Sequence, residues 1–341
     1  MEIYDIHEVE REELSKLKDF IDCHWKKNHA LVLSRQLLDF QHLKDDKYSF
    51  LVAENTQTHE FDALIGFIPT SQFDCGLREN GDYWMAIWKK RDDVVNNEIG
   101  LIGIQLFYRL LKSSDIKSIG ILGISETAKK IYAALHLRIS YLNQWYMLND
   151  SISDYKIVKN AEIIQETPYS ESDVWDIGWI DPTELSSQKI VARYRPMKSV
   201  TYFLNRYASH PLYTYRFLGI YYDNQLECIL ATRDVYANGA KAIRVIDALG
   251  SVGGMIGRKL KMLMIEENAE YIDFLNHGIP DETFIGMGFR LLDFDGNMIV
   301  PCYFEPFEQR NVRIDLAYKA SFNYVAFKGD GDQDRPSVIN L

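Results

Sequence analysis

The feature that most constrains the fold is a repeat of one element order in the two halves of the chain. A shift of 152 residues carries the apolar strand expected at 118–124 onto 270–276. The same shift carries Ile104, in the amphipathic segment before that strand, onto Ile256. Equal spacing at low residue identity is what a duplicated domain predicts, and 341 residues suffice for two domains.

Hydrophobic periodicity gives the expected elements of each half. In the first half we expect strands at 3–9, 48–55, 62–69, 83–90, 118–124 and 141–148, with helices at 99–112 and 126–137. In the second half we expect a helix at 196–207 and a long helix that follows a glycine-rich turn and ends at Glu267. The strands expected there are 216–222, 226–234, 242–249 and 270–276. The sequence therefore predicts an α/β (α+β) protein with two domains, each a mixed, mostly antiparallel sheet flanked by helices. Their bounds are 1–150 and 188–341, with 151–187 as a linker.

Charge and cysteine content exclude several classes of function. The net charge of −11 disfavours nucleic acid and anionic membranes as partners. The longest nearly apolar stretch, 99–111, is too short to span a membrane, and the acidic N-terminal segment is unlike a signal peptide, so we expect a cytoplasmic protein. No metal site is expected, because the cysteines are scattered without a C-x-x-C pair: Cys23, Cys75, Cys228 and Cys302.

Two glycines, Gly100 and Gly103, open the amphipathic helix of the first half. Backbone N–H groups at such a helix N-terminus favour an anion, and a pyrophosphate fits there. A dinucleotide-binding turn would need a third glycine early in a parallel βαβ unit, whereas this turn follows an antiparallel meander. The remaining alternative is a glycine turn that only packs strand on helix.

The order of meander, glycine turn, helix, strand and the helix ETAKKIYAALHLR resembles the GNAT superfamily of acyl-CoA-dependent N-acyltransferases. This resemblance implies that the turn Glu98–Gly103 holds the coenzyme A pyrophosphate and that splayed strands hold the pantetheine arm. It also implies that Tyr132 protonates the departing thiolate, although a purely packing tyrosine is the alternative. The glycines stand three apart, which departs from the common Q/R-x-x-G-x-G/A pattern. The acyl-CoA-binding residues expected on this basis are Trp84, Ile87, Trp88, Glu98, Ile99, Gly100, Leu101, Gly103 and Ser125.

The second half resembles the same fold, and its segment ETFIGMGFR matches the helix-to-strand ending of the family. Phe284 stands where Tyr132 stands in the first half. Because phenylalanine has no proton to give to a thiolate, we expect one catalytic copy and one copy that binds the acceptor.

Asp247 lies in an alternating strand and is expected to share a face with Ile243, Val245 and Leu249. An aspartate on an apolar face is costly unless it is paired. Asp247 is therefore a candidate catalytic base or a ligand for the substrate amine. A structural salt bridge to an arginine such as Arg233 is the alternative.

His277 and Asn276 follow the next strand, at the edge where open sheets usually place site residues. His277 is a candidate acceptor for the proton of the amine, with a turn histidine as the alternative. Arg193 and Arg195 precede Pro196 and suit a diphosphate, although a solvated cluster is equally compatible. The substrate-binding residues expected are Arg193, Arg195, Tyr213, Tyr215, Arg244 and Asn276.

Three further segments, IRVIDALG, SHPLYTY and FKGDGDQDRP, look like those of bacterial sugar N-acyltransferases from surface-polysaccharide (O-antigen or capsule) pathways. That resemblance implies acyl-CoA and a dTDP-linked 3-amino-3,6-dideoxyhexose as substrates, with an acetyl or 3-hydroxybutanoyl group transferred by direct attack. The last segment is either a loop that binds sugar hydroxyls or a frayed terminus, since its aspartates lack the glycine and glutamate of a calcium loop.

Two other functions stay open at this point. A peptidoglycan-type aminoacyltransferase would also use tandem GNAT-like domains, but its tRNA-linked donor suits an acidic chain poorly. A non-catalytic binding protein with a degenerate site is the second alternative. The sequence leaves the oligomeric state open, including a homo-oligomer.

Overall fold

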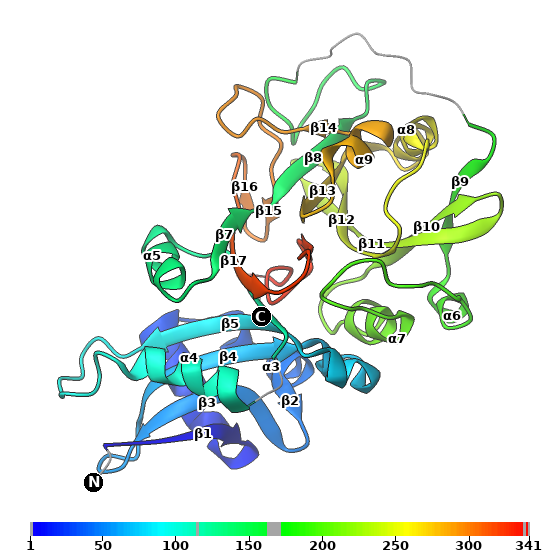
Figure 1. Cartoon of the computed structure of the whole chain (residues 1–341). Coiled ribbons are helices and arrows are strands. Elements are labelled where there is room, and N and C mark those ends of the chain that lie inside the picture. The colour runs from blue at the N-terminus through cyan, green and yellow to red at the C-terminus, as the bar shows by residue number, and fades with distance from the viewer. Residues whose placement is uncertain (1–2, 114–115, 162–171, 337–338, 340–341) are drawn as a thin grey trace.

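Two eight-stranded sheets form the framework of the protein (Figure 1). The computed structural model describes residues 3–113, 116–161, 172–336 and 339. The first sheet has the order β1-β3-β4-β5-β6-β17-β7, with β2 beside β3. The second sheet has the order β14-β8-β13-β12-β11-β10-β9, with β18 beside β13. The predicted fold class, two mixed sheets flanked by helices, is confirmed.

The strands of the first sheet are β1 (Tyr4–Glu10), β2 (Leu43–Lys44), β3 (Lys47–Asn55), β4 (Phe61–Pro69), β5 (Asp82–Lys90), β6 (Ser118–Leu122), β7 (Arg138–Tyr141) and β17 (Asp315–Ala320). Those of the second are β8 (Asn143–Leu148), β9 (Trp175–Ile180), β10 (Arg216–Tyr222), β11 (Gln225–Ala237), β12 (Ala240–Gly250), β13 (Ala269–His277), β14 (Arg290–Leu291) and β18 (Ala326–Phe327). A separate pair consists of β15 (Tyr303–Phe304) and β16 (Phe307–Glu308).

The α-helices are α1 (Leu14–Phe20), α2 (Ala30–Leu33), α3 (Arg35–His42), α4 (Ile102–Ser113), α5 (Glu126–Ala134), α6 (Pro182–Leu185), α7 (Val200–Phe203), α8 (Gly257–Glu266) and α9 (Asp281–Gly286). The other helical segments are η1 (Arg11–Glu13), η2 (Ile21–Trp25), η3 (Thr70–Gln72), η4 (Cys75–Asn80) and η5 (Leu204–Ala208).

The repeat predicted from the sequence is visible in the strand directions. In each half an antiparallel meander ends in one parallel pair, β5 with β6 and β12 with β13. An amphipathic helix connects each pair. In α4, the buried side chains of Ile102, Leu106 and Leu110 pack on the first sheet, because apolar residues recur at helical spacing.

The two halves exchange a strand. The single closing strand predicted at 141–148 is wrong, because the chain breaks at the buried Leu142 between β7 and β8. β7 stays in the first sheet, whereas β8 pairs with β13 and β14 of the second sheet. In return, β17 from the C-terminal half lies between β6 and β7 of the first sheet. Each sheet thus contains one strand from the other half of the chain.

The predicted domain bounds stay predictions. Strand β9 lies inside the predicted linker, of which residues 162–171 fall outside the described part. The helix predicted at 196–207 begins later, at Val200, because the Ser199 hydroxyl accepts the N–H of Tyr202 and caps α7.

One buried cluster of apolar side chains joins the two halves. Its members include Ile68, Phe73, Trp84 and Leu122 from the first half and Phe217, Ile229, Ile246 and Leu275 from the second. A core that crosses between the sheets fixes their relative position.

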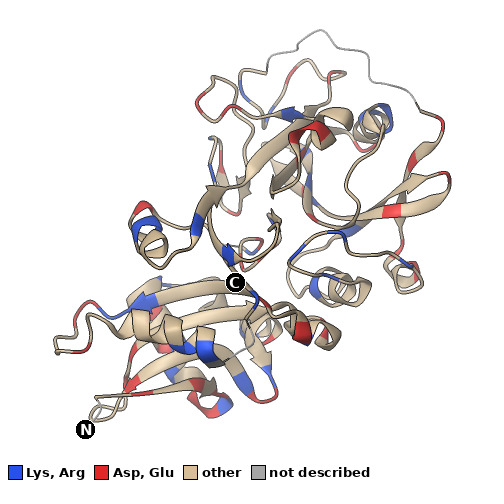
Figure 2. Ribbon diagram, viewed as in Figure 1, with Lys and Arg blue, Asp and Glu red and all other residues tan. Residues whose placement is uncertain are grey.

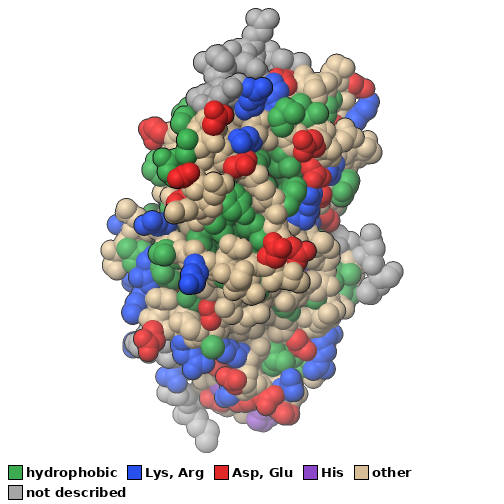
Figure 3. Space-filling view, turned by 90° about the vertical axis from the view of Figure 1, so that its right-hand side faces the viewer, with side chains coloured by type: hydrophobic (Ala, Val, Ile, Leu, Met, Phe, Trp, Pro, Cys, Tyr) green, Lys and Arg blue, Asp and Glu red, His purple; other side chains and the backbone are tan. Residues whose placement is uncertain are grey.

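The surface carries charges of both signs. Lys and Arg are interspersed with Asp and Glu along both halves (Figure 2), and the face shown in Figure 3 mixes acidic, basic and hydrophobic side chains. Among the described residues, no helix has the length and apolar character required to cross a membrane.

Candidate active site

A bulge in β5 accompanies the end of its pairing with β6, and the divergence of the two strands beyond that point is called the first cleft. Their parallel pairing ends where Met85 faces Ile121. At that point β5 contains an extra residue relative to β4, since Phe67 pairs with Met85 but Ile65 pairs with Trp88. A bulge of this kind bends its strand, so β5 departs from β6 after Met85.

The second sheet has an equivalent cleft between β12 and β13. Parallel pairing ends where Val245 faces Phe274. β12 then contains an extra residue relative to β11, because Thr232 pairs with Val245 and Ala231 pairs with Asp247. The duplicated halves therefore share both the cleft and the bulge that produces it.

The two clefts differ in what lies inside them. In the second cleft, β18 adds to β13 through the pairs Asn276–Phe327 and His277–Ala326. On the other side, the N–H of Gly329 donates to the carbonyl oxygen of Ile246 at 2.8 Å. Residues 326–330 of the C-terminal tail thus fill the second cleft, and most of the tail, residues 326–336, is buried. A frayed terminus is wrong for this segment.

The first cleft contains no such strand. Within the described residues, no backbone segment pairs with the edge of β5 beyond Met85 that faces away from β4. Peptide groups on that edge are available to an extended ligand, in the way that a sheet edge accepts an added strand.

The glycine turn stands at the mouth of the first cleft. The side-chain oxygen of Asn96 accepts the N–H groups of Glu98 and Ile99 at 2.9 and 2.8 Å. The amide of Asn96 in turn donates to the hydroxyl of Tyr4 at 2.7 Å. Asn96 thereby fixes the turn to β1, and the first N–H groups of α4 precede any intrahelical hydrogen bond. Asn96 was not among the residues predicted from the sequence.

Tyr132 packs inside the first cleft on Trp88. The two ring centroids lie 5.4 Å apart, and the indole N–H of Trp88 donates to the carbonyl oxygen of Gly103 at 3.2 Å. A Cβ on Gly103 would lie 3.2 Å from that indole nitrogen, so glycine permits this close approach. The Tyr132 hydroxyl has no hydrogen-bond partner among the described residues, and burial raises its pKa.

Other residues predicted to bind acyl-CoA lie around the same cleft. Gly100 and Leu101 are exposed at the turn. The Ser125 hydroxyl accepts the N–H of Ala128 and caps α5. The buried side chains of Trp84 and Ile87 belong to apolar clusters away from Tyr132. Trp84 still pairs with Gly120, before the cleft begins, so only the backbone of Ile87 lies at the cleft.

Phe284, the counterpart of Tyr132, is fully buried and stacks on Trp145 with centroids 5.0 Å apart. This position is therefore apolar in the second half.

The prediction that Asp247 shares a face of its strand with Ile243 and Val245 is wrong. The bulge in β12 turns its side chain to the opposite side of the sheet. Its carboxylate accepts hydrogen bonds from the ammonium of Lys198 at 2.6 Å and the hydroxyl of Tyr207 at 2.5 Å. Lys198, rather than Arg233, is the cation that neutralises it.

His277 lies apart from Tyr132. Its Nδ1 is 3.1 Å from the hydroxyl of Ser140, its ring packs on Tyr318, and burial lowers its pKa. Tyr132 packs with the side of the first sheet that carries Ala317, whereas Tyr318 points to the opposite side. Asn276 is buried, and its amide nitrogen has no partner among the described residues.

The two arginines of the predicted basic pair have different surroundings. Arg193 is exposed. The guanidinium of Arg195 donates to the carbonyl oxygen of Asn80 at 3.2 Å and lies 3.6 Å from the carboxylate of Asp82. Arg195 therefore bridges the two halves.

A polar cavity of about 150 Å³ lies between the second sheet and the C-terminal tail. Its lining residues are Arg233, Arg244, Cys302, Tyr303, Phe304, Glu305, Lys328, Asp332, Gln333, Asp334 and Arg335.

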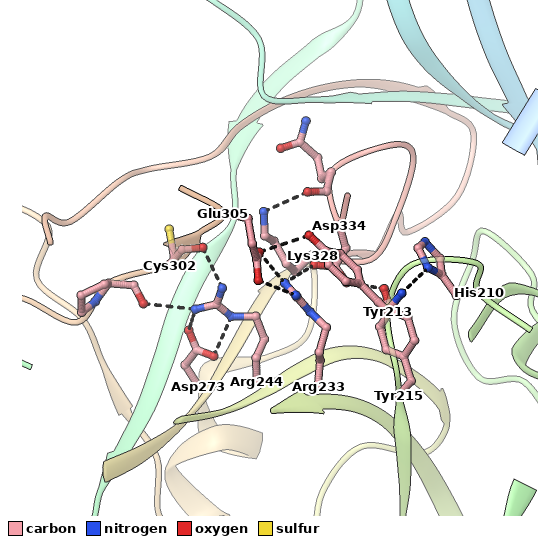
Figure 4. A network of polar contacts seen from close by, with 12 residues as sticks. His210, Tyr213, Tyr215, Arg233, Arg244, Asp273, Cys302, Glu305, Lys328 and Asp334 are labelled. Atoms are coloured by element: carbon pink, nitrogen blue, oxygen red, sulfur yellow. Dashed lines mark hydrogen bonds and ion pairs between the residues drawn. The ribbon is translucent and has the colours of Figure 1, made fainter. Parts of the chain in front are cut away.

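Arg233 is the centre of this network (Figure 4). Its guanidinium donates to Glu305 at 3.0 Å and to Asp334 at 3.2 Å, and it stacks on the ring of Tyr213. The hydroxyls of Tyr213 and Tyr215 donate to Glu305 and Asp334, respectively. Of the predicted substrate-binding residues, Arg244 thus lines the cavity, and Tyr213 and Tyr215 bind two of its lining carboxylates from behind. Arg193 and Arg195 lie outside its lining.

The tail connects the cavity to the first half. The side-chain amide of Gln333 donates to the carbonyl oxygen of Leu122 at 3.2 Å, at the end of β6. Leu122 ends the strand that forms one side of the first cleft. The cavity and the first cleft are therefore neighbours, joined by Gln333.

Comparison with known proteins supports the fold. No family model and no curated protein matches the sequence. Among solved structures, a GCN5-related N-acetyltransferase from Anabaena variabilis has a TM-score of 0.54 at 9% identity, covering 93% of this chain and 72% of that one. A GCN5-related N-acetyltransferase from Kribbella flavida has a TM-score of 0.54 at 7% identity, covering 93% and 71%. This chain has a GNAT-like fold.

A third GNAT-like neighbour is a protein of unknown function from Enterococcus faecalis, described as a probable N-acyltransferase. It has a TM-score of 0.53 at 6% identity, covering 93% of this chain and 72% of that one. At these identities the likeness concerns the fold, and the chemistry must be argued from the residues of this chain.

Among the cavity residues, Glu305 was not predicted from the sequence, whereas Lys328 and Asp334 belong to the segment predicted either to bind sugar hydroxyls or to fray. The signal in that segment is the run FKGDGDQDRP, in which Lys328 and three aspartates alternate with small or amide residues. Charges spaced in this way near a chain end are equally typical of a solvated tail, so burial had to come from the tertiary structure.

Proposed function

We propose that this protein transfers an acyl group from acyl-CoA to an amine, with the first cleft as the acyl-CoA site and the polar cavity as the acceptor site. The observation that carries the proposal is the asymmetry between the clefts. Residues 326–330 of the tail occupy the second cleft. In the first, no described backbone segment pairs with the edge of β5 beyond Met85, and a glycine turn and a tyrosine lie beside that edge.

Backbone groups of the first half would bind two parts of coenzyme A, its pyrophosphate and its pantetheine arm. The N-terminal N–H groups of α4, held in place through Asn96, would bind the pyrophosphate. The free edge of β5 near Ile87 would pair with the amide groups of the pantetheine arm. Acyl-CoA supplies the activated thioester, and the mechanism requires no metal.

Two groups would stabilise the developing charges. Backbone N–H groups on the bent part of β5 would donate to the oxyanion of the tetrahedral intermediate. The hydroxyl of Tyr132 would donate to the departing sulfur. Because burial raises the pKa of this phenol, it remains protonated near neutrality and available as a donor.

The acceptor proposed is a nucleotide-linked amino-deoxy sugar, such as a dTDP-linked one, used for surface polysaccharides by a cytoplasmic enzyme. The cavity offers both cationic donors and carboxylate acceptors around Arg233, with Tyr303 and Phe304 as apolar walls. Sugar hydroxyls need such a mixture of donors and acceptors. Its position beside Leu122 would direct the amine toward the first cleft. Asp247 and His277 remain predicted bases, and a sugar amine is already partly neutral near pH 7.

The test is thiol release by the full chain, measured over a panel of acyl-CoAs with amino-sugar nucleotides. We expect release that requires both substrates. Release that stays at background with every pair would favour a non-catalytic binding protein and reject the proposal. Transfer only from an aminoacyl-tRNA would favour a peptidoglycan-type aminoacyltransferase instead.

A further inference from the structure

Lys328 differs from the other cations of the polar cavity. Its side chain is buried, with 2% of the residue exposed, and its ammonium donates to the carbonyl oxygen of Gln333 at 3.2 Å. A lysine ammonium has three protons to donate. Within the described part of the chain, this is its only hydrogen bond, and no carboxylate lies within 4.0 Å of it.

The neighbouring cations all have a carboxylate partner. Arg244 binds Asp273 at 2.7 Å, and Arg335 binds Asp332 at 3.1 Å. Arg233 is bound by Glu305 and Asp334, as Figure 4 shows. The carboxylates of the cavity are therefore engaged by arginines, and Lys328 is left with a carbonyl oxygen and the ring of Tyr303, 4.6 Å away.

Around Lys328, the described residues offer more hydrogen-bond donors than acceptors to pair with them. The Nε of Arg233 is also buried and has no partner in that part of the chain. Buried donors without acceptors are unfavourable, and a buried charge without a counter-ion is more so. Burial accordingly lowers the pKa of Lys328. A cavity of about 150 Å³ borders both groups, so an incoming group has space to satisfy them.

We propose that this cavity binds an oxyanion, a phosphate or carboxylate group of the acceptor, through the ammonium of Lys328. Oxygen atoms of such a group accept several charge-assisted hydrogen bonds at once and supply the missing counter-charge. This inference rests on the proposed function in one respect, the identity of the bound molecule as the acceptor. For a nucleotide-linked sugar, the group would be the diphosphate.

Direct binding to the full chain tests the site without any catalytic assay. The probes are inorganic phosphate, pyrophosphate and acetate, titrated by calorimetry into the wild type, Lys328→Met, Lys328→Arg and Lys319→Met. Lys319 is exposed on β17, so its variant is the matched control. We expect Lys328→Met to weaken binding at least about tenfold and Lys328→Arg to retain most of it, whereas Lys319→Met has no effect.

The preferred probe identifies the source of the oxyanion. Binding of phosphate or pyrophosphate over acetate indicates a phosphorylated acceptor, and the reverse preference indicates a carboxylated one. Failure of all three probes to bind the wild type, or equal binding by Lys328→Met, overturns the proposal.

Thermal unfolding without added anion separates a binding role from a structural one. If Lys328 lacks a counter-ion, replacing it with the similarly sized Met should raise the melting temperature, and added phosphate should stabilise the wild type but not the variant. A lower melting temperature, or failure of Lys328→Met to fold, would mean that the protein itself satisfies this ammonium, which overturns the proposal.

Kinetics distinguish this inference from the proposed function. In the thiol-release assay, Lys328→Met should raise the KM for the acceptor while leaving the KM for acyl-CoA unchanged. Anion binding that depends on Lys328 in a protein without transferase activity would reject the proposed function alone. Transferase activity with an unchanged acceptor KM in Lys328→Met would reject the acceptor role of this site alone.

Discussion

Gly329 and Ile246 are joined by a backbone hydrogen bond of 2.8 Å, and this contact lies inside the splayed cleft of the second sheet. The tail thus takes the position that a ligand would need in order to add to β12. The same cleft in the first sheet has no such occupant among the described residues. The two halves thus share a bulge but differ in what pairs with the strand beyond it.

A side chain at position 329 would disrupt this contact. A Cβ there would lie 2.6 Å from both Ile246 Cγ2 and the hydroxyl of Tyr207. We expect Gly329→Ala to lower the free energy of unfolding by about 1–3 kcal/mol, as overpacking of a filled core does. Urea denaturation measures this change. Gly286→Ala is the control, because a Cβ there meets no atom within 4 Å, and an equal loss in both variants would contradict the prediction.

Removing the hydroxyl of Tyr132 should lower turnover without unfolding the protein. This hydroxyl has no partner among the described residues, so Tyr132→Phe removes no hydrogen bond within that part of the protein. We expect kcat to fall about ten- to a thousandfold, in line with the loss of a proton or hydrogen-bond donor to the leaving group. Tyr108→Phe, at an exposed position on α4, should keep full activity. An unchanged rate in Tyr132→Phe would remove this residue from the mechanism.

Acidification should destabilise the protein through its buried histidines. Burial lowers the pKa of His29 to about 3 and that of His42 to about 4. The unfolded chain takes up these protons below about pH 6.5, whereas the folded chain does so only near pH 3 to 4. The free energy of unfolding should therefore fall between pH 6.5 and 4, by about 1.4 kcal/mol per pH unit for each histidine.

A variant isolates this contribution from other titrating groups. Burial raises the pKa of Asp330 to about 6, which gives a slope of opposite sign in part of the same range. The quantity to compare is therefore the slope of the free energy of unfolding against pH, rather than the free energy itself. Between pH 6 and 4.5, His42→Gln should reduce the slope by about 1.4 kcal/mol per pH unit, whereas the exposed His59→Gln should not change it. Equal slopes in both variants would show that His42 titrates normally.

Arg195 should matter for stability more than for substrate binding. It donates to the carbonyl oxygen of Asn80 and lies near Asp82, which itself accepts the N–H of Met197 and the hydroxyl of Ser118. We expect Arg195→Met to lower the free energy of unfolding by about 1–3 kcal/mol and to leave the KM for the acceptor unchanged. A raised acceptor KM at unchanged stability would instead support the substrate-binding role predicted from the sequence.

Local patterns predicted the framework of the fold well. The shift of 152 residues correctly predicted that β6 and β13 are equivalent strands, because each strand and helix is encoded by its own periodicity. Their parallel pairing came from the structure. The exchange of β8 and β17 was not predictable in this way. Alternation in a strand shows that it belongs to a sheet, but not to which sheet, and only the buried Leu142 separates β7 from β8.

The candidate site was predicted less completely, for two physical reasons. Strict alternation placed Asp247 beside Val245, but one extra residue in β12 reversed its direction. Bulges leave a weak signal in sequence because they depend on pairing with the neighbouring strand. The role of Lys328 depends on which carboxylates other cations occupy, and that competition is decided only when distant segments come together. Tyr132 could be selected because its position relative to the helix and the preceding strand is local.

Strand exchange makes the halves inseparable as folding units. A chain cut after residue 150 would leave each fragment with a gap in its sheet, between β6 and β7 in one and between β13 and β14 in the other. Each missing strand is present on the other fragment. Neither half could therefore be lost without removing an internal strand from the sheet of the other. This holds even though only the first half has the residues for the proposed chemistry.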